Sequence, residues 1–276
     1  MGARPHIRKV VFHVNRDKPG ADAVRARLSA FARSVGIEVV KGIKGLDGSV
    51  DAVVVVLGGD GTMLSAVHRY PGVPLLGFNL GSLGYLAAVE EPHFEDAIQA
   101  LAHGRFLISW RSMLEVRSRR ALNEVVVAHA SAGHALDLTL LVDGTPATRF
   151  AADGLIVSTP TGSTAYSLSA GGPVLLPDTR SFVVTPVCPH ALATRPLVVR
   201  DSARLTVRPA SAAAVHVDGA EAFRVAAGES VDIAKAEVAV PLVELPGYDP
   251  CEVLSRKLGW GGFARAMPQA SRGKGA

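Results

Sequence analysis

Apolar residues in the first hundred positions follow two alternating patterns. Short runs that are apolar at nearly every position predict strands at residues 7–14, 37–40, 52–57 and 73–78. Apolar residues at helical spacing predict helices among these strands, at residues 21–35, 62–69 and 92–102. A run that is apolar throughout, such as residues 52–57, is typical of a strand in a parallel sheet covered on both faces. The alternation predicts an α/β domain, doubly wound around a mainly parallel sheet, over residues 1–105.

The pattern changes after residue 105, where helical spacing nearly disappears and short alternating runs take over. Asp143-Gly144 and Asp218-Gly219 each follow alternating apolar residues, and Asp-Gly in that setting is the strongest short-range signal for a β-hairpin. We therefore expect an all-β, antiparallel, sandwich-like domain at residues 106–250. We expect residues 251–276 to pack partly on the first domain and then to form a disordered basic tail.

The charge of the chain is concentrated at its end. The 276 residues carry a formal net charge of +4, and the pI is near 9.3. Such a pI is compatible with a nucleic-acid partner, so the position of the charge matters. Five basic residues and no acidic residue follow Glu252, and the rest of the chain is almost neutral. The basicity therefore belongs to the tail, and we expect no nucleic-acid partner.

Neither a membrane segment nor a cysteine framework is apparent. The longest clean apolar run, residues 52–57, is far shorter than the ~20 residues that a membrane-spanning helix needs. The start of the chain has no apolar signal core. Two cysteines, Cys188 and Cys251, are too few for a disulfide framework or a cysteine-based zinc site. We expect a cytoplasmic protein with no membrane partner.

A glycine-rich loop stands where the predicted strand 52–57 ends and a helix begins. Its sequence is Gly58-Gly59-Asp60-Gly61-Thr62. Ligands of open α/β sheets bind at this end of the strands, where glycines expose backbone N–H groups and the helix N-terminus favours anions. The loop therefore predicts a phosphate site, although a tight turn with Asp60 as helix cap fits equally well. A carboxylate repels phosphate unless it binds a metal, takes a proton or orients a hydroxyl nucleophile.

Two further segments are candidates for ligand binding. Residues 158–167 contain six serine or threonine residues, and no charged residue occurs between Gly154 and Leu176. Small hydroxyls and glycines can hydrogen-bond phosphate and ribose, and Tyr166 can stack on a base, although a polar loop capping a short helix is the ordinary alternative. The polar pair Asn123-Glu124 heads an apolar strand, where it could also be simply the start of that strand.

Together and in this order, these segments resemble the NAD kinases, which phosphorylate the adenosine ribose 2′-hydroxyl of NAD. The resemblance extends roughly from Val53 to Gly219 and includes the segments 185–190 and 195–197. Phosphofructokinases and lipid kinases share the glycine loop, whereas the hydroxyl-rich run is far more specific. The sequence departs from many relatives at Ala220, where they have glutamine, and at Ala151 and Ser65, where some are basic.

The resemblance implies a role for each matching residue. Asp60 is the implied catalytic residue, as base or orienting group for the ribose hydroxyl. The implied phosphate-donor site consists of Gly58, Gly59, Gly61 and Thr62. The implied NAD contacts are Asp60, Gly61, Asn123, Glu124, His134, Asp153, Thr164, Ala165, Tyr166, Ser167, Leu168 and Ser169. The resemblance further implies ATP or polyphosphate as donor, a divalent cation that we expect to be Mg²⁺ with unknown protein ligands, and a homodimer or homotetramer.

Two other functions are compatible with parts of this pattern. A lipid kinase of the diacylglycerol type has a similar glycine loop but needs an exposed membrane-docking surface, which the sequence does not show. A sensor that binds NAD or NADP without turnover has no use for a carboxylate such as Asp60 inside a phosphate loop.

Overall fold

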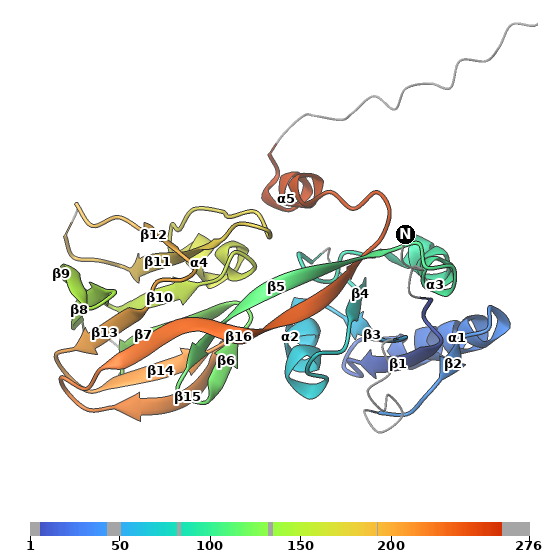
Figure 1. The fold of residues 1–276 in the computed structure, drawn as a ribbon, viewed down its shortest axis with the longest axis horizontal. Helices are drawn as coiled ribbons and strands as arrows, with labels where there is room; N and C mark the ends of the chain where they lie inside the picture. The colour runs from blue at the N-terminus through green and yellow to red at the C-terminus, as the bar shows by residue number, and fades with distance from the viewer. Residues whose placement is uncertain (1–5, 43–50, 82–83, 132–134, 192, 261–276) are drawn as a thin grey trace, which may run out of the picture.

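The computed structural model describes residues 6–42, 51–81, 84–131, 135–191 and 193–260. The chain forms two halves that lie side by side along its longest axis, an α/β half and a β half (Figure 1). No helix in the part of the chain that the structure describes is long and apolar enough to cross a membrane.

The α/β half has a parallel sheet with helices on both faces. Its strands are β1 (Lys9–Val14), β2 (Glu38–Val39), β3 (Ala52–Gly58) and β4 (Leu75–Asn79), in the order β2-β1-β3-β4. Helices α1 (Ala21–Ser34) and α3 (Phe94–Ala102) share one core with Val53, Val55 and Leu57, and α2 (Asp60–Arg69) shares the other with Val54 and Val56. This burial of β3 on both faces confirms the predicted doubly wound architecture.

Two predicted helix boundaries need correction. Helix α2 begins at Asp60 and not at Thr62, because the first turn already includes the end of the glycine loop. Helix α3 begins at Phe94, because the predicted start at Pro92 forms a separate 3₁₀ turn, η2 (Glu91–His93). Proline is compatible with the first positions of either helix type, so the sequence pattern did not distinguish them.

The β half is an antiparallel sandwich, as predicted. Its strands are β5 (Leu107–Val116), β6 (Arg119–Ala121), β7 (Glu124–His129), β8 (Leu136–Val142), β9 (Thr145–Ala152), β10 (Gly154–Ser158), β11 (Ser181–Val187), β12 (Leu197–Arg200), β13 (Leu205–Pro209), β14 (Ala213–Val217), β15 (Ala220–Val225) and β16 (Val231–Glu244). One sheet has the order β12-β11-β10-β7-β14-β15, and its buried side chains share one core with those of β8 and β13.

Both Asp-Gly pairs make the predicted hairpins. Asp143 and Gly144 join β8 to β9, and Asp218 and Gly219 join β14 to β15. All four residues have positive φ, between 47° and 83°, which is the backbone geometry that a two-residue type I′ turn requires. Between β10 and β11 the hydroxyl-rich run forms a 3₁₀ turn, η3 (Gly162–Thr164), and a short helix, α4 (Tyr166–Ser169).

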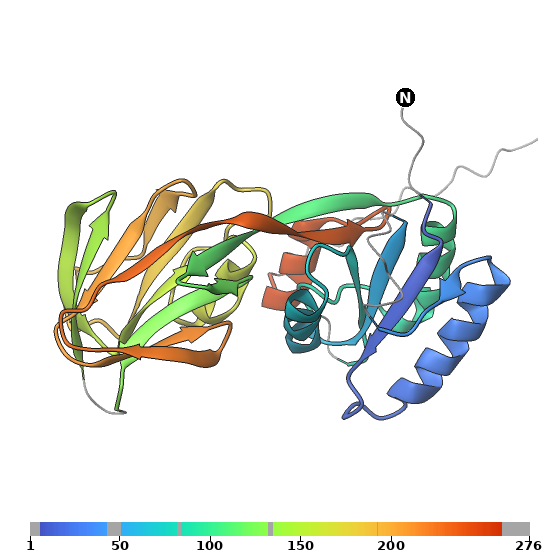
Figure 2. The same ribbon diagram turned by 60° about the horizontal axis from the view of Figure 1, so that its bottom comes forward.

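The long strand β16 continues the parallel sheet of one half into the sandwich of the other. The 14-residue β16 pairs with β13 and β5 and then runs parallel to β4, so the parallel sheet continues into the sandwich as one ten-stranded sheet. In Figure 2, β5 and β16 are seen spanning the distance between the halves. The sequence patterns did not predict this continuity. Helix α5 (Pro250–Leu258) then lies over the junction (Figure 1).

Candidate active site

The glycine loop lies at the carboxyl edge of the parallel sheet, where Gly58 of β3 pairs with Asn79 of β4. A Cβ on Gly58 would lie 2.2 Å from Thr62 Oγ1, so only glycine fits there. Thr62 Oγ1 accepts the Gly59 N–H at 3.4 Å and thereby caps α2. Gly59 and Gly61 face open space. The loop therefore packs against Thr62 at Gly58, whereas at Gly59 and Gly61 its backbone is accessible to a ligand.

Asp60 holds a neighbouring turn. Its carboxylate accepts three successive backbone N–H groups: Tyr85 on Oδ2 at 2.9 Å, and Leu86 and Ala87 on Oδ1 at 2.9 and 3.1 Å. A Cβ on Gly84 would lie 2.1 Å from Asp60 Oδ1. Asp60 is therefore more than a helix cap, because it attaches the segment after β4 to the first turn of α2.

A second aspartate holds the Asn123-Glu124 pair in the same way. The carboxylate of Asp218, in the β14–β15 turn, accepts the N–H groups of Leu122 at 2.9 Å, Asn123 at 2.8 Å and Glu124 at 3.2 Å. The hairpin turn explains the Asp218-Gly219 sequence, and the three hydrogen bonds give Asp218 an additional role. Asp218 orders the backbone on which Asn123 and Glu124 stand.

Glu124 is a buried carboxyl group with an open acceptor position. Its residue is 6 % exposed, and its Oε2 has no hydrogen-bond partner among the described residues. Burial raises the pKa of Glu124 to about 7, the charge of Asp218 adds to the rise, and the Tyr166 N–H opposes it. Buried polar atoms normally have partners, so this unpartnered carboxyl oxygen is a candidate position for a ligand group.

Most hydroxyls of the run 158–167 serve the fold of the run itself. Ser158, Thr159, Ser163 and Ser167 are buried. The Thr159 hydroxyl donates to the Leu122 carbonyl, and the Ser167 hydroxyl pairs with Thr185 Oγ1 at 2.8 Å. The side chains that remain accessible belong to Thr161, Thr164, Ala165, Tyr166, Leu168 and Ser169. Ser167 is a predicted NAD contact, but its hydroxyl oxygen is already hydrogen-bonded inside the protein.

The hydroxyl-rich run and the Asn123-Glu124 pair are brought together, whereas Asp153 is not. A Cβ on Gly162 would lie 2.1 Å from the Asn123 carbonyl oxygen, so the run packs directly on that backbone. In the β7–β10 ladder, Glu124 pairs with Ser158 and Ala128 with Gly154. Asp153 precedes Gly154 and lies roughly 17 Å along the strand from Ser158. His134 lies outside the described residues.

The turn that Asp60 holds and the hydroxyl-rich run meet at the junction of the halves. Tyr85 and Leu86, from the turn that Asp60 holds, line one small cavity of about 40 Å³ together with Thr161 and Thr164. Val253 and Leu254 of α5 also line it. Sequence reasoning missed the contribution of α5 and of the Tyr85–Ala87 N–H groups. The only available signal for the turn was the change from strand to loop after residue 78.

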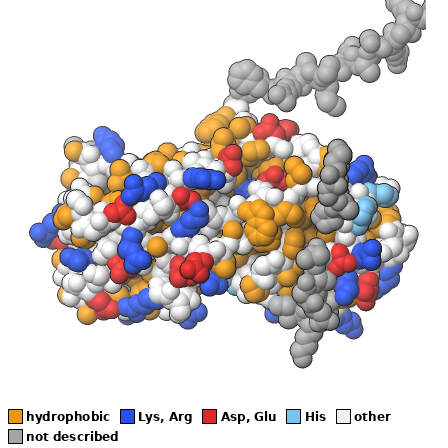
Figure 3. Space-filling view, in the orientation of Figure 1, with side chains coloured by type: hydrophobic (Ala, Val, Ile, Leu, Met, Phe, Trp, Pro, Cys, Tyr) orange, Lys and Arg blue, Asp and Glu red, His pale blue; other side chains and the backbone are white. Residues whose placement is uncertain are grey.

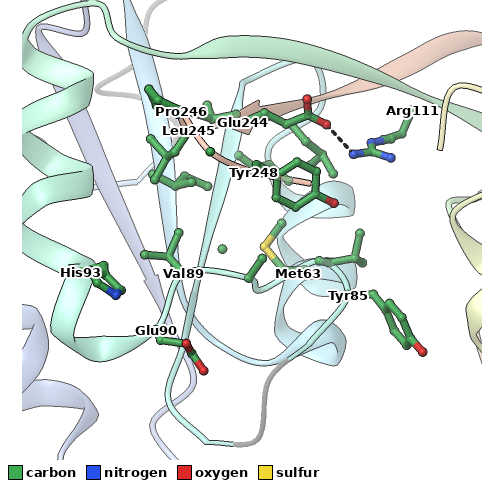
Figure 4. Close-up of a pocket in the computed structure, with 18 of the residues that line it drawn as sticks. Met63, Tyr85, Val89, Glu90, His93, Arg111, Glu244, Leu245, Pro246 and Tyr248 are labelled. Carbon is green, nitrogen blue, oxygen red and sulfur yellow. Dashed lines mark hydrogen bonds and ion pairs between the residues drawn. The ribbon is translucent and has the colours of Figure 1, made fainter. Parts of the chain in front are cut away.

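A larger cavity, of about 390 Å³, lies behind the same turn. Its wall combines apolar side chains, such as Met63, Val89 and Leu245, with the ionisable side chains of Glu90 and His93 (Figure 4). At one end the buried Arg111 pairs with Glu244 at 2.8 Å, beside Tyr248. Burial raises the pKa of Tyr248, and Arg111 opposes the rise.

The face in Figure 3 shows acidic and basic side chains intermingled over the β half, unlike the single-sign patch of a polyanion-binding surface.

Both halves of the chain match known protein families. The family model of the ATP-NAD kinase N-terminal domain matches residues 10–106, and that of the C-terminal domain matches residues 122–245. The NAD kinase of Syntrophotalea carbinolica is 40% identical over 230 residues, covering 78% of this chain and 80% of that protein. The NAD kinase of Thiobacillus denitrificans is 36% identical over 274 residues, covering 89% of this chain and 94% of that protein.

Two solved structures share the fold. Yeast NADH kinase complexed with NADH superposes with a TM-score of 0.82 at 22% identity, covering 95% of this chain and 90% of that one. An NAD kinase from Archaeoglobus fulgidus in complex with ATP gives a TM-score of 0.76 at 26% identity, covering 92% of this chain and 99% of that one. Fold and site thus define a two-domain enzyme of the nucleotide-phosphorylating class. The chain belongs to the ATP-NAD kinase family.

Proposed function

We propose that this chain transfers a phosphoryl group from ATP to the 2′-hydroxyl of the adenosine ribose of NAD, with Asp60 aiming that hydroxyl. The observation that carries the proposal is the shared cavity at the junction, where the Asp60-held turn meets the hydroxyl-rich run. A ribose hydroxyl is a weak acid, and phosphoryl transfer passes through a loose transition state. Positioning the hydroxyl therefore matters more than removing its proton early.

Asp60 keeps one acceptor position for this task. An ionised carboxylate has about four lone-pair positions, and three are occupied by the Tyr85, Leu86 and Ala87 N–H groups. Oδ1 carries two of these bonds and Oδ2 only one, so Oδ2 can accept a substrate hydroxyl without releasing the turn. The same three bonds prevent the carboxylate from rotating away.

On the acceptor side, we propose that NAD completes the hydrogen bonding of Glu124. Its unpartnered Oε2 would take a hydroxyl of the dinucleotide, and the accessible Tyr166, 45 % exposed, would stack on a base. Asn123, Thr164 and the neighbouring accessible residues of the run would line the dinucleotide. Ser167 would act through the fold of the run, because its hydroxyl is bonded to Thr185.

On the donor side, the open backbone of Gly59 and Gly61 at the start of α2 suits the phosphates of ATP. A Cβ on Gly81 would lie 3.4 Å from Lys18 Nζ, so this lysine supplies positive charge near the sheet edge. No group of three or more His, Cys, Asp or Glu side chains in the described residues could hold a metal ion. We therefore propose that a divalent cation arrives with the donor phosphates and keeps its waters.

From the family alone, we propose that the protein is cytoplasmic and forms a homodimer or homotetramer.

Asp153 is too far along the β7–β10 ladder to meet Glu124 directly. Its predicted contact with NAD therefore needs either a dinucleotide that extends along the ladder or a second copy of the chain. Sedimentation with and without NAD tests the assembly.

The test is formation of NADP from NAD with ATP, with polyphosphate and with no donor. We expect NADP with ATP. No NADP with any donor would overturn the proposal. Phosphorylation of diacylglycerol in vesicles would favour the lipid-kinase alternative, and tight NAD binding without turnover would favour the sensor.

A further inference from the structure

Helix α2 has a polar contact at each end. At its start, Asp60 holds the turn 84–87. In its last turn, His68 Nε2 lies 3.5 Å from Asp218 Oδ2, across the junction between the halves. The His68 side chain is 50 % exposed, whereas that of Asp218 is only 4 % exposed. A buried carboxylate is thus reached by an imidazole that remains in contact with solvent.

The contact matters because of what Asp218 supports. Its two oxygens accept the N–H groups of Leu122, Asn123 and Glu124, and the Asp218 N–H in turn donates to the Glu124 carbonyl at 3.0 Å. The Asp218 carboxylate therefore supports the backbone of the proposed NAD-binding pair. His68 is the side chain that connects this carboxylate to the helix carrying the phosphate loop.

We infer that His68 is a positioning residue for NAD: it holds the Asp218 carboxylate and so joins helix α2 to the Asn123-Glu124 turn. The inference rests on the proposed function. Eight residues separate His68 from Asp60, about 12 Å along a helix, so His68 does not touch the reacting atoms. Its effect should appear in the affinity for NAD and not in the binding of the donor.

Among the described residues, Asp218 is the charged group that pairs with His68. The cavities on either side of His68 are lined by Arg119 and Arg120 of β6, Glu221 of β15 and Glu237 of β16. Arg224 pairs with Glu221 at 2.8 Å, and Glu115 pairs with Arg120 at 3.3 Å. The hydrogen bond with Asp218 raises the pKa of His68, and burial opposes the rise.

This direction sets the pH dependence. A histidine with a raised pKa keeps its ion pair below that pKa and loses it as the pH rises through it. Glu124 also titrates near neutral pH, so the expectation concerns a difference between proteins. On the alkaline side, the Michaelis constant for NAD should gain an increment in the wild type that comes from His68. A variant without an ionisable group at position 68 should lack that increment.

The experiment compares wild type, His68→Ala, His68→Gln and the control His103→Ala in the full chain. His103 also ends a helix, α3, but its ring contacts the Gln99 carbonyl. Steady-state kinetics at several pH values give KM for NAD and for ATP, and calorimetry gives NAD affinity without turnover. We expect His68→Ala to raise KM for NAD about tenfold, the scale of one charge-assisted hydrogen bond, with KM for ATP unchanged. His68→Gln should be intermediate and free of the alkaline increment.

Three outcomes would overturn the inference. The first is an unchanged NAD affinity in His68→Ala, and the second is an equal weakening of NAD binding and ATP binding. The third is a lower kcat and a lower melting temperature with both KM values unchanged. An effect as large in His103→Ala would do the same. If wild type forms no NADP but His68→Ala still binds NAD about tenfold more weakly, the proposed reaction fails and the positioning role stands.

Discussion

The turn at residues 84–87 and the turn at residues 122–124 are built alike and leave different groups open. In each, one aspartate accepts three successive backbone N–H groups: Asp60 in the first, Asp218 in the second. In the first turn the aspartate is itself the proposed catalytic group, with three acceptor positions filled. In the second turn the aspartate only supports, and the neighbouring Glu124 has an unfilled oxygen.

This difference can separate turnover from NAD affinity within one site. A carboxylate held by three N–H groups is rigid and can aim a hydroxyl, whereas its removal also disturbs the turn that it holds. A buried carboxyl with an open oxygen is destabilising until a ligand completes it. We therefore expect Asp60 to affect turnover and Glu124 to affect NAD binding, at a cost in stability.

The largest expected effect is that of Asp60→Asn. The amide cannot accept all three N–H groups and cannot aim a hydroxyl as a carboxylate does, so kcat should fall ~10²–10⁴-fold. The assay is NADP formation at saturating NAD and ATP. Asp96→Asn, an exposed carboxylate in the first turn of α3, is the matched control and should be unaffected. Full activity in Asp60→Asn would reduce Asp60 to a structural residue.

Glu124 makes the stability of the protein depend on pH. Its pKa rises from 4.5 to about 7 on folding, so between these values the folded state binds one more proton than the unfolded chain. Stability therefore falls as the pH rises through this window, by up to about 3 kcal/mol. Glu124→Gln should remove this loss and be more stable than wild type at pH ~8 but not at pH ~5.

Denaturant unfolding at both pH values checks this, with the exposed Glu252→Gln as control. An identical pH dependence in wild type and Glu124→Gln would show that Glu124 is not the group responsible. Glu124→Gln should also bind NAD more weakly, which would identify a residue kept for function at the expense of stability.

A pair of glycine variants sharpens the comparison within the first turn. Gly84→Ala places a methyl group 2.1 Å from Asp60 Oδ1, whereas Gly59→Ala meets nothing within 4 Å. Overpacking of this kind costs about 1–3 kcal/mol, so Gly84→Ala should unfold more easily and lose turnover. Gly59→Ala should keep its stability and raise KM for ATP, because the added methyl group covers the backbone proposed to bind the phosphates of ATP. Thermal melts with kinetics distinguish the two, and equal stability of both variants would contradict the geometry.

The smallest effect is expected at the hydroxyl-rich run. Ser167→Ala leaves the Thr185 hydroxyl without its partner and should cost about 1 kcal/mol of stability, with KM for NAD little changed. Tyr166→Ala, at an exposed neighbouring position, should instead raise KM for NAD and leave the melting temperature unchanged. The opposite assignment of the two effects would mean that the buried hydroxyls bind the ligand directly.

Local patterns predicted what local physics determines. The apolar run 52–57 predicted a strand covered on both faces, and the two Asp-Gly pairs predicted hairpins, because each signal lies within a few residues. The position of Gly58-Gly59-Asp60 at a strand end also predicted the sheet edge at which the loop lies.

Long-range contacts could not be predicted in this way. Asp218 accepts N–H groups from residues more than 90 positions away, and β16 meets β4 across most of the chain. No periodicity in the intervening sequence indicates such pairings. The buried hydroxyls of Thr159, Ser163 and Ser167 show the same limit, because composition identifies a hydroxyl but not the direction in which it points.

The most direct test of the account separates turnover from binding at the two carboxyl groups. Calorimetric titration of NAD into Asp60→Asn and Glu124→Gln, combined with kcat for each, gives both quantities. We expect Asp60→Asn to bind NAD nearly as well as wild type but to have lost turnover, and Glu124→Gln to bind NAD poorly but to retain most of its kcat at saturation. The reverse pattern, with Asp60 governing NAD affinity and Glu124 governing kcat, would contradict it.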